Sequence, residues 1–333
     1  MVIPPDERIE SSAIVRSNGG PTAAPSAAIT TARTPTISNR ILDGLGITAW
    51  VGPAFLLMFA VTAYPLAMNL INSFLDEAPL GQAQPFVGLK NYNNVLSSPA
   101  FLSALIHTLQ WTIGVIAVAF AIGLGLALLL NQRFPGATVA RVLFLLPWMT
   151  PSIAGAIMWR FIYNSDYGVL NSALRGIGLD ALAVGWTTNP SYSLWAAMIV
   201  HIWRSYGFYM MMLLGGLQSV PAEIIEAAEV DGAGPIRRLW SVIMPQLQPV
   251  IIMLVLLDLI WVTNNFDTIF VVTGGGPIRS SETLPLYVYL TAFASTRFTE
   301  AAAGAVIMFL IAGAMIGIYL AVLARTRGPG EAT

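Results

Sequence analysis

The chain has 333 residues, of which 56% are apolar and only 10% are charged, whereas an ordinary soluble domain carries about 25% charged residues. The mean hydropathy is +0.71, and 16 basic against 17 acidic residues leave a formal net charge of −1. These values exclude a soluble enzyme, a disordered chain and a nucleic-acid-binding protein. The absence of cysteine excludes a disulfide framework and a cysteine-based metal site. The composition therefore predicts an integral membrane protein.

Residues 1–40 are rich in Ser, Thr, Ala, Pro and Gly and show no helical or strand period. Such a segment buries too little apolar surface to offset the entropy of ordering, so we expect a disordered tail. No apolar core precedes Ile47, which excludes a cleavable signal peptide.

Six apolar stretches follow, each long enough for the roughly 20 residues that a helix needs to cross the ~30 Å hydrocarbon core. They are Ile47–Leu70, Thr108–Leu130, Val142–Tyr163, Ser193–Leu217, Pro249–Val272 and Ala302–Leu323. The intervening segments are too short for a globular domain outside the membrane. The predicted fold is therefore an all-α membrane protein, with one bundle of six transmembrane helices over residues 41–325 and a short tail at 326–333.

Basic residues beside the spans predict the orientation of the bundle. Eight lie on one side, namely Arg33, Arg40, Arg133, Arg141, Arg237, Arg238, Arg325 and Arg327. Five lie on the other, namely Lys90, Arg160, Arg175, Arg279 and Arg297. The excess predicts that both termini are cytoplasmic, and that residues 218–248 form the one long cytoplasmic loop.

The loop at 218–248 carries signals for two helices. Pro221 suits a helix start, and the glutamates that follow it place negative charge near the positive end of the helix dipole. Gly232 is a helix stop, because glycine reaches the left-handed conformation at little cost. A second helical stretch is expected over Pro235–Met244. Alternatively, the segment is a solvated loop that only connects two spans.

The same loop closely resembles the E-A-A loop of ABC importer permeases, whose pattern is E-A-A, three residues, G, nine residues, I-x-L-P. The matching residues are Glu226, Ala227, Ala228, Gly232, Val242, Ile243, Met244 and Pro245. The chain departs from the pattern only by Val242 for Ile and Met244 for Leu, which are both apolar.

Other segments are similar to carbohydrate importers in particular. They are Phe86–Tyr92, which fits F-x-G-L-x-N-Y, Pro147-Trp148, Tyr167–Asn171, and Thr273–Pro277, which reads T-G-G-G-P. Over about Ile47 to Ala324 the chain thus resembles the first-type (MalF/UgpA-like) permeases of carbohydrate ABC importers. The resemblance implies a bacterial inner-membrane protein that pairs with a second E-A-A permease. It further implies an ABC ATPase dimer, which binds ATP and Mg²⁺, and an extracytoplasmic sugar-binding protein.

The resemblance also implies how the loop works. The helix with Glu226, Ala227 and Ala228 would dock in a cleft of the ATPase, and Gly232 would permit the sharp turn that follows. Pro245, at the end of the pattern, is the fifth predicted residue of this ATPase-coupling segment. Nucleotide binding would switch the bundle between inward-open and outward-open states. The chain itself has no G-x-x-x-x-G-K-[ST] sequence and a single lysine, Lys90, so we expect no ATP hydrolysis by this subunit.

The residues predict neither a catalytic constellation nor a metal site. The two histidines, His107 and His201, are far apart in sequence, and no His/Asp/Glu cluster has the spacing of metal ligands. We interpret His201 as a packed helix-interface residue. Besides it, Arg204, Asp258 and Asp267 are the ionisable residues within the spans, and intramembrane charges are costly enough to indicate function.

Arg204 and Asp258 have similar predicted depths, which leaves two alternatives open. They form a structural ion pair between neighbouring helices, or Arg204 faces the translocation cavity and binds sugar hydroxyls. The fifth span also carries Trp261, Asn264 and Asn265 near Asp267. Aromatic faces stack on sugar rings, and amide and carboxylate groups bind hydroxyls.

These five residues, Arg204, Trp261, Asn264, Asn265 and Asp267, are the predicted substrate path. Adjacent residues do not share one helix face, so we expect only one of the two asparagines to line the cavity. Other functions are weighed against sugar import. Among importers, an amino-acid or metal permease is the closest rival, but the F-x-G-L-x-N-Y and T-G-G-G-P stretches favour a carbohydrate, glycerol phosphate or another small polar solute. A secondary transporter would leave the E-A-A pattern unexplained. A membrane-embedded enzyme would need clustered His, Asp or Ser residues on facing spans, which the sequence lacks.

Overall fold

The computed structural model describes the backbone of residues 37–78 and 83–326 and the side chains of 50–78 and 83–324. Two compact units meet after Ala60, and every contact given below lies within the second unit, from Val61 onward. Most of the predicted N-terminal tail, residues 1–36, lies outside the described residues, whereas 37–40 already belong to the first helix. Residues 327–333 of the predicted C-terminal tail also lie outside them.

The described residues are helical throughout, apart from connecting segments and one isolated antiparallel bridge between Leu75 and Phe86. The α-helices are α1 (Ile37–Asn72), α2 (Lys90–Leu96), α3 (Pro99–Leu130), α4 (Ala137–Met149), α5 (Ser152–Ile162), α6 (Val169–Gly176), α7 (Ser193–Gln218), α8 (Ala222–Val230), α9 (Pro235–Arg238), α10 (Met244–Thr263), α11 (Asp267–Val272), α12 (Leu284–Tyr289) and α13 (Phe298–Thr326). π-helical turns at Leu239–Ile243 and Leu290–Ala294 follow α9 and α12, and Asp180–Leu182 forms a 3₁₀ turn.

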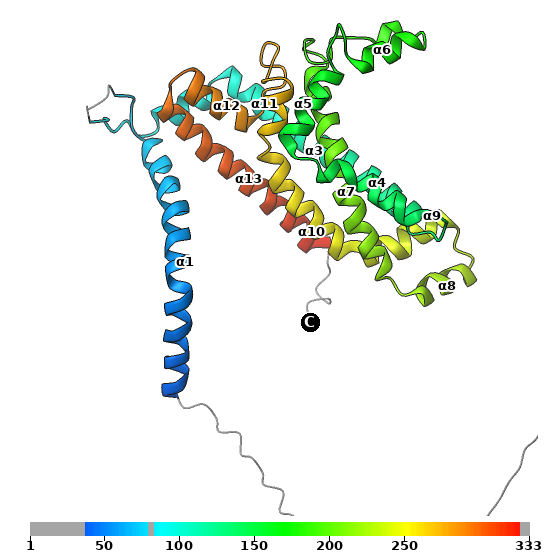
Figure 1. Cartoon of the computed structure of the whole chain (residues 1–333). Coiled ribbons are helices and arrows are strands. Elements are labelled where there is room, and N and C mark those ends of the chain that lie inside the picture. The colour runs from blue at the N-terminus through cyan, green and yellow to red at the C-terminus, as the bar shows by residue number, and fades with distance from the viewer. Residues whose placement is uncertain (1–36, 79–82, 327–333) are drawn as a thin grey trace, which may run out of the picture. The chain divides into compact units, whose positions relative to one another are not determined.

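The six predicted spans are confirmed as an all-helical membrane fold. Among the described residues, four helices are long and apolar enough to cross a membrane, and six spans result when each of two bent helix pairs is one span. Helices α8 and α9 lie at one end of the second unit, and α5, α6, α11 and α12 lie at the opposite end (Figure 1).

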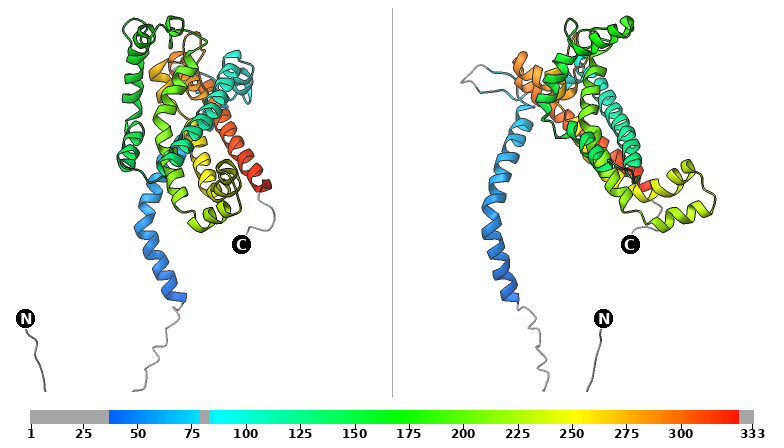
Figure 2. Two further views of the ribbon diagram at one scale, coloured as in Figure 1. Left: turned by 90° about the vertical axis from the view of Figure 1, so that its right-hand side faces the viewer. Right: turned by 45° about the vertical axis from the view of Figure 1, so that its right-hand side comes forward.

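Helix α3 is the central packing element, because side chains from it enter three separate apolar clusters. Its closest neighbour is α7, which lies beside it in both views of Figure 2. The approach depends on Gly123, where an added Cβ would lie 2.4 Å from the Tyr209 Cβ and 2.9 Å from the Met210 backbone nitrogen. Small residues at such contacts let two helix backbones pack closely in a membrane.

The third predicted span is broken near its middle. Helices α4 and α5 meet at an angle of 93°, with Thr150 in extended conformation (ψ 129°) between them. The cause is Pro151, whose ring disfavours helical backbone at the preceding residue. Pro151 then occupies the position before the first residue of α5, where its missing N–H leaves no helical hydrogen bond unmade.

The fifth predicted span is also broken, since α10 ends at Thr263 and α11 begins at Asp267. Non-helical backbone at membrane depth needs internal partners for its carbonyl groups. The Val262 carbonyl accepts hydrogen bonds from the Trp111 indole (3.0 Å) and the Asn265 N–H (3.1 Å). The Asn264 amide donates to the Ile260 carbonyl at 2.8 Å. Polar groups of the break and of α3 thus replace the helical bonds that the break removes.

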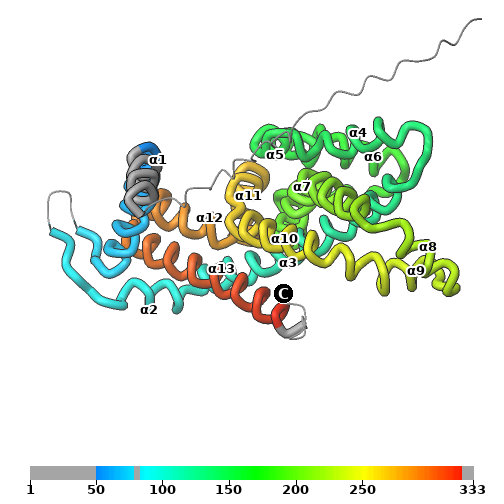
Figure 3. The backbone as a smooth tube through the Cα atoms, turned by 90° about the horizontal axis from the view of Figure 1, so that it is seen from below, coloured from blue at the N-terminus to red at the C-terminus, as the bar shows by residue number. Residues whose placement is uncertain are grey.

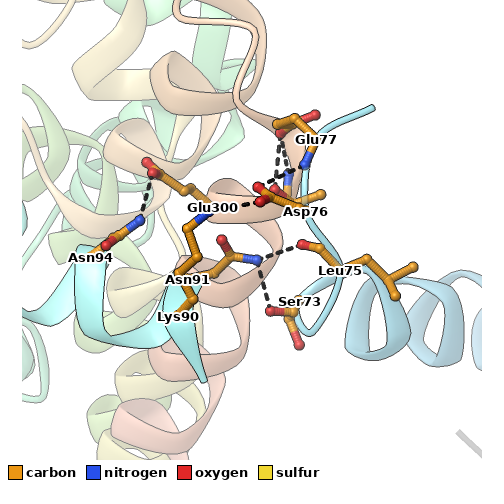
Figure 4. Close-up of polar contacts among 9 residues, drawn as sticks. Ser73, Leu75, Asp76, Glu77, Lys90, Asn91, Asn94 and Glu300 are labelled. Carbon is orange, nitrogen blue, oxygen red and sulfur yellow. Dashed lines mark hydrogen bonds and ion pairs between the residues drawn. The ribbon is translucent and has the colours of Figure 1, made fainter. Parts of the chain in front are cut away.

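The F-x-G-L-x-N-Y stretch forms a junction between α1 and α2 (Figure 4). The Asn91 amide donates to the backbone carbonyls of Ser73 (3.1 Å) and Leu75 (2.7 Å), and Tyr92 shares a 2.6 Å hydrogen bond with the Ser73 hydroxyl. Gly88 supplies the left-handed turn (φ +60°) before α2. This motif therefore has a structural role in holding the segment between α1 and α2 together.

Candidate functional site

A cavity of about 350 Å³ lies between α4, α7 and the end of α10. Figure 3, a view along the bundle, shows α7 next to α10, with α4 on the other side of α7. The cavity is lined by Trp148, His201, Arg204, Ser205, Phe208, Asp258, Trp261 and Asn265. It is thus bordered by the break that separates α10 from α11.

Helix α7 contributes half of the lining because of the spacing along one of its faces. His201, Arg204, Ser205 and Phe208 follow the i, i+3, i+4, i+7 pattern of a single helix face. Gly207 lets this part of α7 approach α4, because an added Cβ there would lie 3.0 Å from the Phe144 carbonyl oxygen. The close approach brings Trp148, near the end of α4, to the cavity wall.

Three aromatic rings from three helices form one wall of the cavity. Trp148 stacks on Phe208 with ring centroids 5.7 Å apart and an interplanar angle of 19°, and Phe208 contacts Trp261 at 5.8 Å. Trp261 remains 54% exposed, so its ring face is available to a ligand. The wall offers the broad apolar faces that bind the C–H faces of a sugar ring.

The contacts of the charged cavity residues bear on the two alternatives for Arg204. Asp258 is 4% exposed, and its carboxylate accepts a hydrogen bond from the Tyr209 hydroxyl on α7. Among the described residues, no carboxylate lies within ion-pair distance of Arg204, although the charges of Asp267 and Asp258 both act on it. The first alternative, an ion pair between Arg204 and Asp258, is thus not formed in the described structure. Asp258 instead accepts a hydrogen bond from Tyr209, and Arg204 lines the cavity.

The other predicted path residues divide between cavity and surroundings. Asn265 lines the cavity together with Trp261, and its buried side-chain oxygen has no hydrogen-bond partner in the described part of the chain. Asn264 instead caps the end of α10. Asp267 accepts a 3.1 Å hydrogen bond from Ser152 at the start of α5, so it joins the two broken spans.

Sequence reasoning missed Trp148, Ser205 and Phe208 as cavity residues and assigned His201 to packing alone. His201 is indeed buried, contacts the Trp111 ring and shares a 3.4 Å hydrogen bond with Thr268, yet it also borders the cavity. For His201, Ser205 and Phe208 the signal was their helical spacing around Arg204 on α7, whereas Trp148 lies on α4 and no such spacing identifies it.

The E-A-A segment is a helix followed by a tight turn. The Ala233 N–H donates to the Ala228 carbonyl at 2.9 Å, and the Gly232 N–H donates to the Glu229 carbonyl at 3.0 Å. This pair of bonds is the Schellman arrangement, which needs a left-handed residue after the helix. Gly232 adopts that conformation, with φ +76°. The chain then turns into α9, where Arg238 forms an ion pair with Glu229.

Beyond the turn, the helices differ from the expected hairpin of two short helices. Residues Pro235–Thr263 form one long helix with a π-helical turn at Leu239–Ile243. The wider turn directly precedes Met244-Pro245, and it accommodates a proline that has no N–H and clashes with the carbonyl four residues earlier. Pro245 thereby lies where the loop passes into the fifth span.

The surface of this end of the second unit is unusually apolar. Glu226 and Ala227 are exposed, and Ala228 is half-buried. Nearby apolar side chains have large exposed fractions, namely Val230 (88%), Ile236 (75%) and Trp240 (61%). An exposed apolar surface that carries charged residues at its edge is typical of a protein-binding surface.

Residues 117–328 match the family described as binding-protein-dependent transport system inner membrane component. A sulfoquinovosyl glycerol transport system permease protein from Agrobacterium fabrum is 31% identical over 282 residues, covering 84% of this chain and 91% of the relative. The trehalose/maltose transport system permease protein MalF of Thermococcus litoralis is 36% identical over 206 residues, covering 62% and 69%. A solved bacterial ABC transporter for import of the polysaccharide alginate has a chain of the same fold, with a TM-score of 0.73, 21% identity and coverage of 86% and 99%.

Proposed function

The chain belongs to the family of binding-protein-dependent transport system inner membrane components, and we propose that its substrate is a sugar that passes through the cavity between α4, α7 and α10. As a member of this family, the chain is a permease subunit of an ABC importer and not an enzyme. It is a multi-pass membrane protein.

The observation that carries the sugar assignment is the composition of the cavity wall. The rings of Trp148, Phe208 and Trp261 face the same space as the donors and acceptors of Arg204, Ser205 and Asn265. A sugar needs both the aromatic rings and the polar groups, because its ring presents apolar C–H faces and its edge presents hydroxyls that donate and accept hydrogen bonds. The two named relatives transport, by their names, a sugar glycoside and two disaccharides.

A second candidate is a small anionic solute such as glycerol phosphate. The Nε atom of Arg204 is buried and has no hydrogen-bond partner in the described residues, so it could bind a phosphate or sulfonate oxygen. The opposing charges of Asp258 and Asp267 make the sugar assignment the stronger one.

The test is transport by the assembled importer in proteoliposomes. Trp261→Ala removes one ring of the wall, and loss of an aromatic contact costs about 0.5–1.5 kcal/mol, or up to roughly tenfold in half-saturating sugar concentration. Trp195→Ala is the matched control, because Trp195 is 57% exposed on α7 and does not line the cavity. Equal transport kinetics for both variants would place the sugar path elsewhere.

The exposed E-A-A helix is proposed to dock on an ATPase dimer, which binds ATP and Mg²⁺ for the whole importer. We further propose that a second E-A-A permease completes the translocation path, that an extracytoplasmic sugar-binding protein delivers the substrate, and that both chain termini are cytoplasmic. The supporting observation is that the E-A-A helix and the apolar side chains beside it remain exposed in this chain.

Docking is tested by two pairs of variants in the reconstituted importer. Glu226→Ala should reduce substrate-stimulated ATP hydrolysis, whereas Glu223→Ala, one turn earlier on α8 and also exposed, should not. Gly232→Pro should abolish it, because proline cannot adopt φ +76°. Gly234→Ala should be tolerated, since Gly234 has φ −64° and open space around it. Normal coupling in Glu226→Ala and Gly232→Pro would refute the docking role.

A further inference from the structure

Two neighbouring hollows lie between α4 and α7 at the end of the bundle that carries the E-A-A loop. The first, of about 650 Å³, is largely polar and is lined by the α3–α4 connection and by Gln218 at the end of α7. The second, of about 220 Å³, is apolar apart from its rim and is lined by Val142, Leu145, Met211, Leu214 and Gly215. Arg141 and Gln218 line both hollows, so the polar space continues into the apolar one.

The apolar hollow exists because α4 and α7 diverge along their length. At Gly207 the helices are in close contact, since an added Cβ would lie 3.0 Å from the Phe144 carbonyl oxygen and 3.3 Å from the Trp148 Cβ. Two turns further along α7, an added Cβ at Gly215 would meet nothing within 4 Å. The groove therefore widens toward the polar hollow, and Leu214 forms its buried wall.

The polar hollow carries positive charge. Arg133 and Arg141 are its charged lining residues, and none of the described acidic residues lines it. The guanidinium of Arg141 is held in place by a 2.7 Å hydrogen bond from Nη2 to the Leu130 carbonyl at the end of α3. Its Nε atom is buried and has no hydrogen-bond partner among the described residues. A fixed arginine with an unused donor is suited to bind a phosphate oxygen.

We propose that this pair of hollows binds an anionic phospholipid, with its phosphate group on Arg133 and Arg141 and one acyl chain in the groove between α4 and α7. The polar hollow lies at the ends of α3 and α7, two of the apolar helices. Basic pockets between membrane helices on the cytoplasmic side are suited to anionic headgroups. The proposal does not depend on the sugar assignment.

Because the polar hollow continues into the apolar groove, the pair of hollows favours a lipid over other occupants. A free phosphate would use the arginines but leave the apolar groove exposed between two helices. A soluble protein partner would reach the polar hollow but not the groove, which runs along α7 toward the middle of the span. Only an amphipathic ligand with an anionic head and an apolar tail occupies both spaces at once.

The groove is tested separately from the arginines. Gly215→Leu places a side chain in the groove, and the Cβ that it adds meets nothing within 4 Å. Gly125→Leu is the matched control, since Gly125 has the same open surroundings on α3 and lines neither hollow. For the headgroup, Arg133→Gln with Arg141→Gln removes the charges, and Arg160→Gln at the opposite end of the bundle is the control.

The assay is native mass spectrometry of the purified importer complex after titration with phosphatidylglycerol, phosphatidylcholine or inorganic phosphate. We expect retained phosphatidylglycerol but little phosphatidylcholine, and at least about a tenfold loss of phosphatidylglycerol on removal of the arginines. Gly215→Leu should lower its retention, and Gly125→Leu should not. Equal retention in Gly215→Leu and Gly125→Leu, or inorganic phosphate binding as tightly as the lipid, would overturn the proposal. Equal retention of both lipids would overturn it as well.

Discussion

We predict that the hydrogen bond between Tyr209 and Asp258 stabilises the bundle, so that Asp258 has a structural role in the cavity. Tyr209 is fully buried and Asp258 is 4% exposed, and the tyrosine hydroxyl donates to the carboxylate between α7 and α10. Tyr209→Phe removes this donor without changing the size of the ring. The carboxylate then lacks its protein partner while it remains desolvated.

The size of the effect follows from the kind of bond. Hydrogen bonds to charged groups contribute about 1.5–3 kcal/mol in soluble proteins. Bonds between membrane helices average about 0.6 kcal/mol and reach about 1.7 kcal/mol. Because both partners are buried and one is a carboxylate, we expect a loss near the upper membrane value, about 1.5 kcal/mol. For a bundle of this size that corresponds to a fall in Tm of about 3 °C.

The measurement is thermal unfolding of the purified permease in detergent, with Tyr206→Phe as the control. Tyr206 lies on the same helix, is half-buried and has no hydrogen bond in the described structure. In a double-mutant cycle, Asp258→Leu combined with Tyr209→Phe should cost less than the sum of the single changes. A Tyr209→Phe variant as stable as Tyr206→Phe, with additive double-mutant energies, would refute the assignment of this bond.

Three further predictions concern packing, pH and the segment between α1 and α2. Gly123→Ala should destabilise the bundle by about 1–3 kcal/mol, since its Cβ would lie 2.4 Å from a carbon of α7, whereas Gly125→Ala meets nothing within 4 Å and should be neutral in the same melting assay. Burial raises the pKa of Glu282 above its ordinary value of 4.5, more than a neighbouring arginine lowers it. The folded state therefore loses stability as pH rises from the unfolded pKa through the raised one, and Glu282→Gln should melt higher than wild type at neutral pH but not at pH 4. Asn91→Ala should cost about 1–2 kcal/mol by removing two hydrogen bonds to the Ser73 and Leu75 carbonyls just beyond α1. It should also increase hydrogen exchange in α2, unlike Asn94→Ala, whose side chain makes one exposed contact.

The number and type of spans were predictable because hydropathy and length respond directly to the membrane. The breaks in the third and fifth spans were not predicted, because the mean hydropathy of a segment carries no information on its backbone conformation. The local signals were nonetheless present. Pro151 disfavours helix at the preceding residue, and Asn264 and Asn265 are poor helix formers followed by Asp267, a residue suited to a helix start.

Arg204 and Trp261, which line the cavity, were singled out by the sequence. A charge or a polar patch inside a membrane span is energetically costly, so it draws attention to its position. Ser205 and Phe208 were missed because neither is unusual in a membrane helix. Only the position of α4 against α7, which Gly207 allows, assigns them to the cavity. The sequence did not predict the hydrogen-bond partner of Asp258 either. The donor is Tyr209, which lies on the same helix as Arg204.

The cavity and the E-A-A helix are connected by the same two helices. Helix α7 carries Arg204 on its cavity face and continues for 14 residues to Gln218, directly before the E-A-A segment, a distance of about 21 Å along the axis. On the other side of the loop, the helix that begins at Pro235 continues to Thr263, beside the second break. These two helices are joined by the Tyr209–Asp258 bond. Residues 264–266 lie at the far end of the long helix, and Thr150-Pro151 lies between α4 and α5. The Ser152–Asp267 bond connects the helices that follow these two non-helical segments. In the proposed docking role, a displacement of the E-A-A helix would be carried along these helices to the proposed sugar cavity, with the two non-helical segments as the hinge.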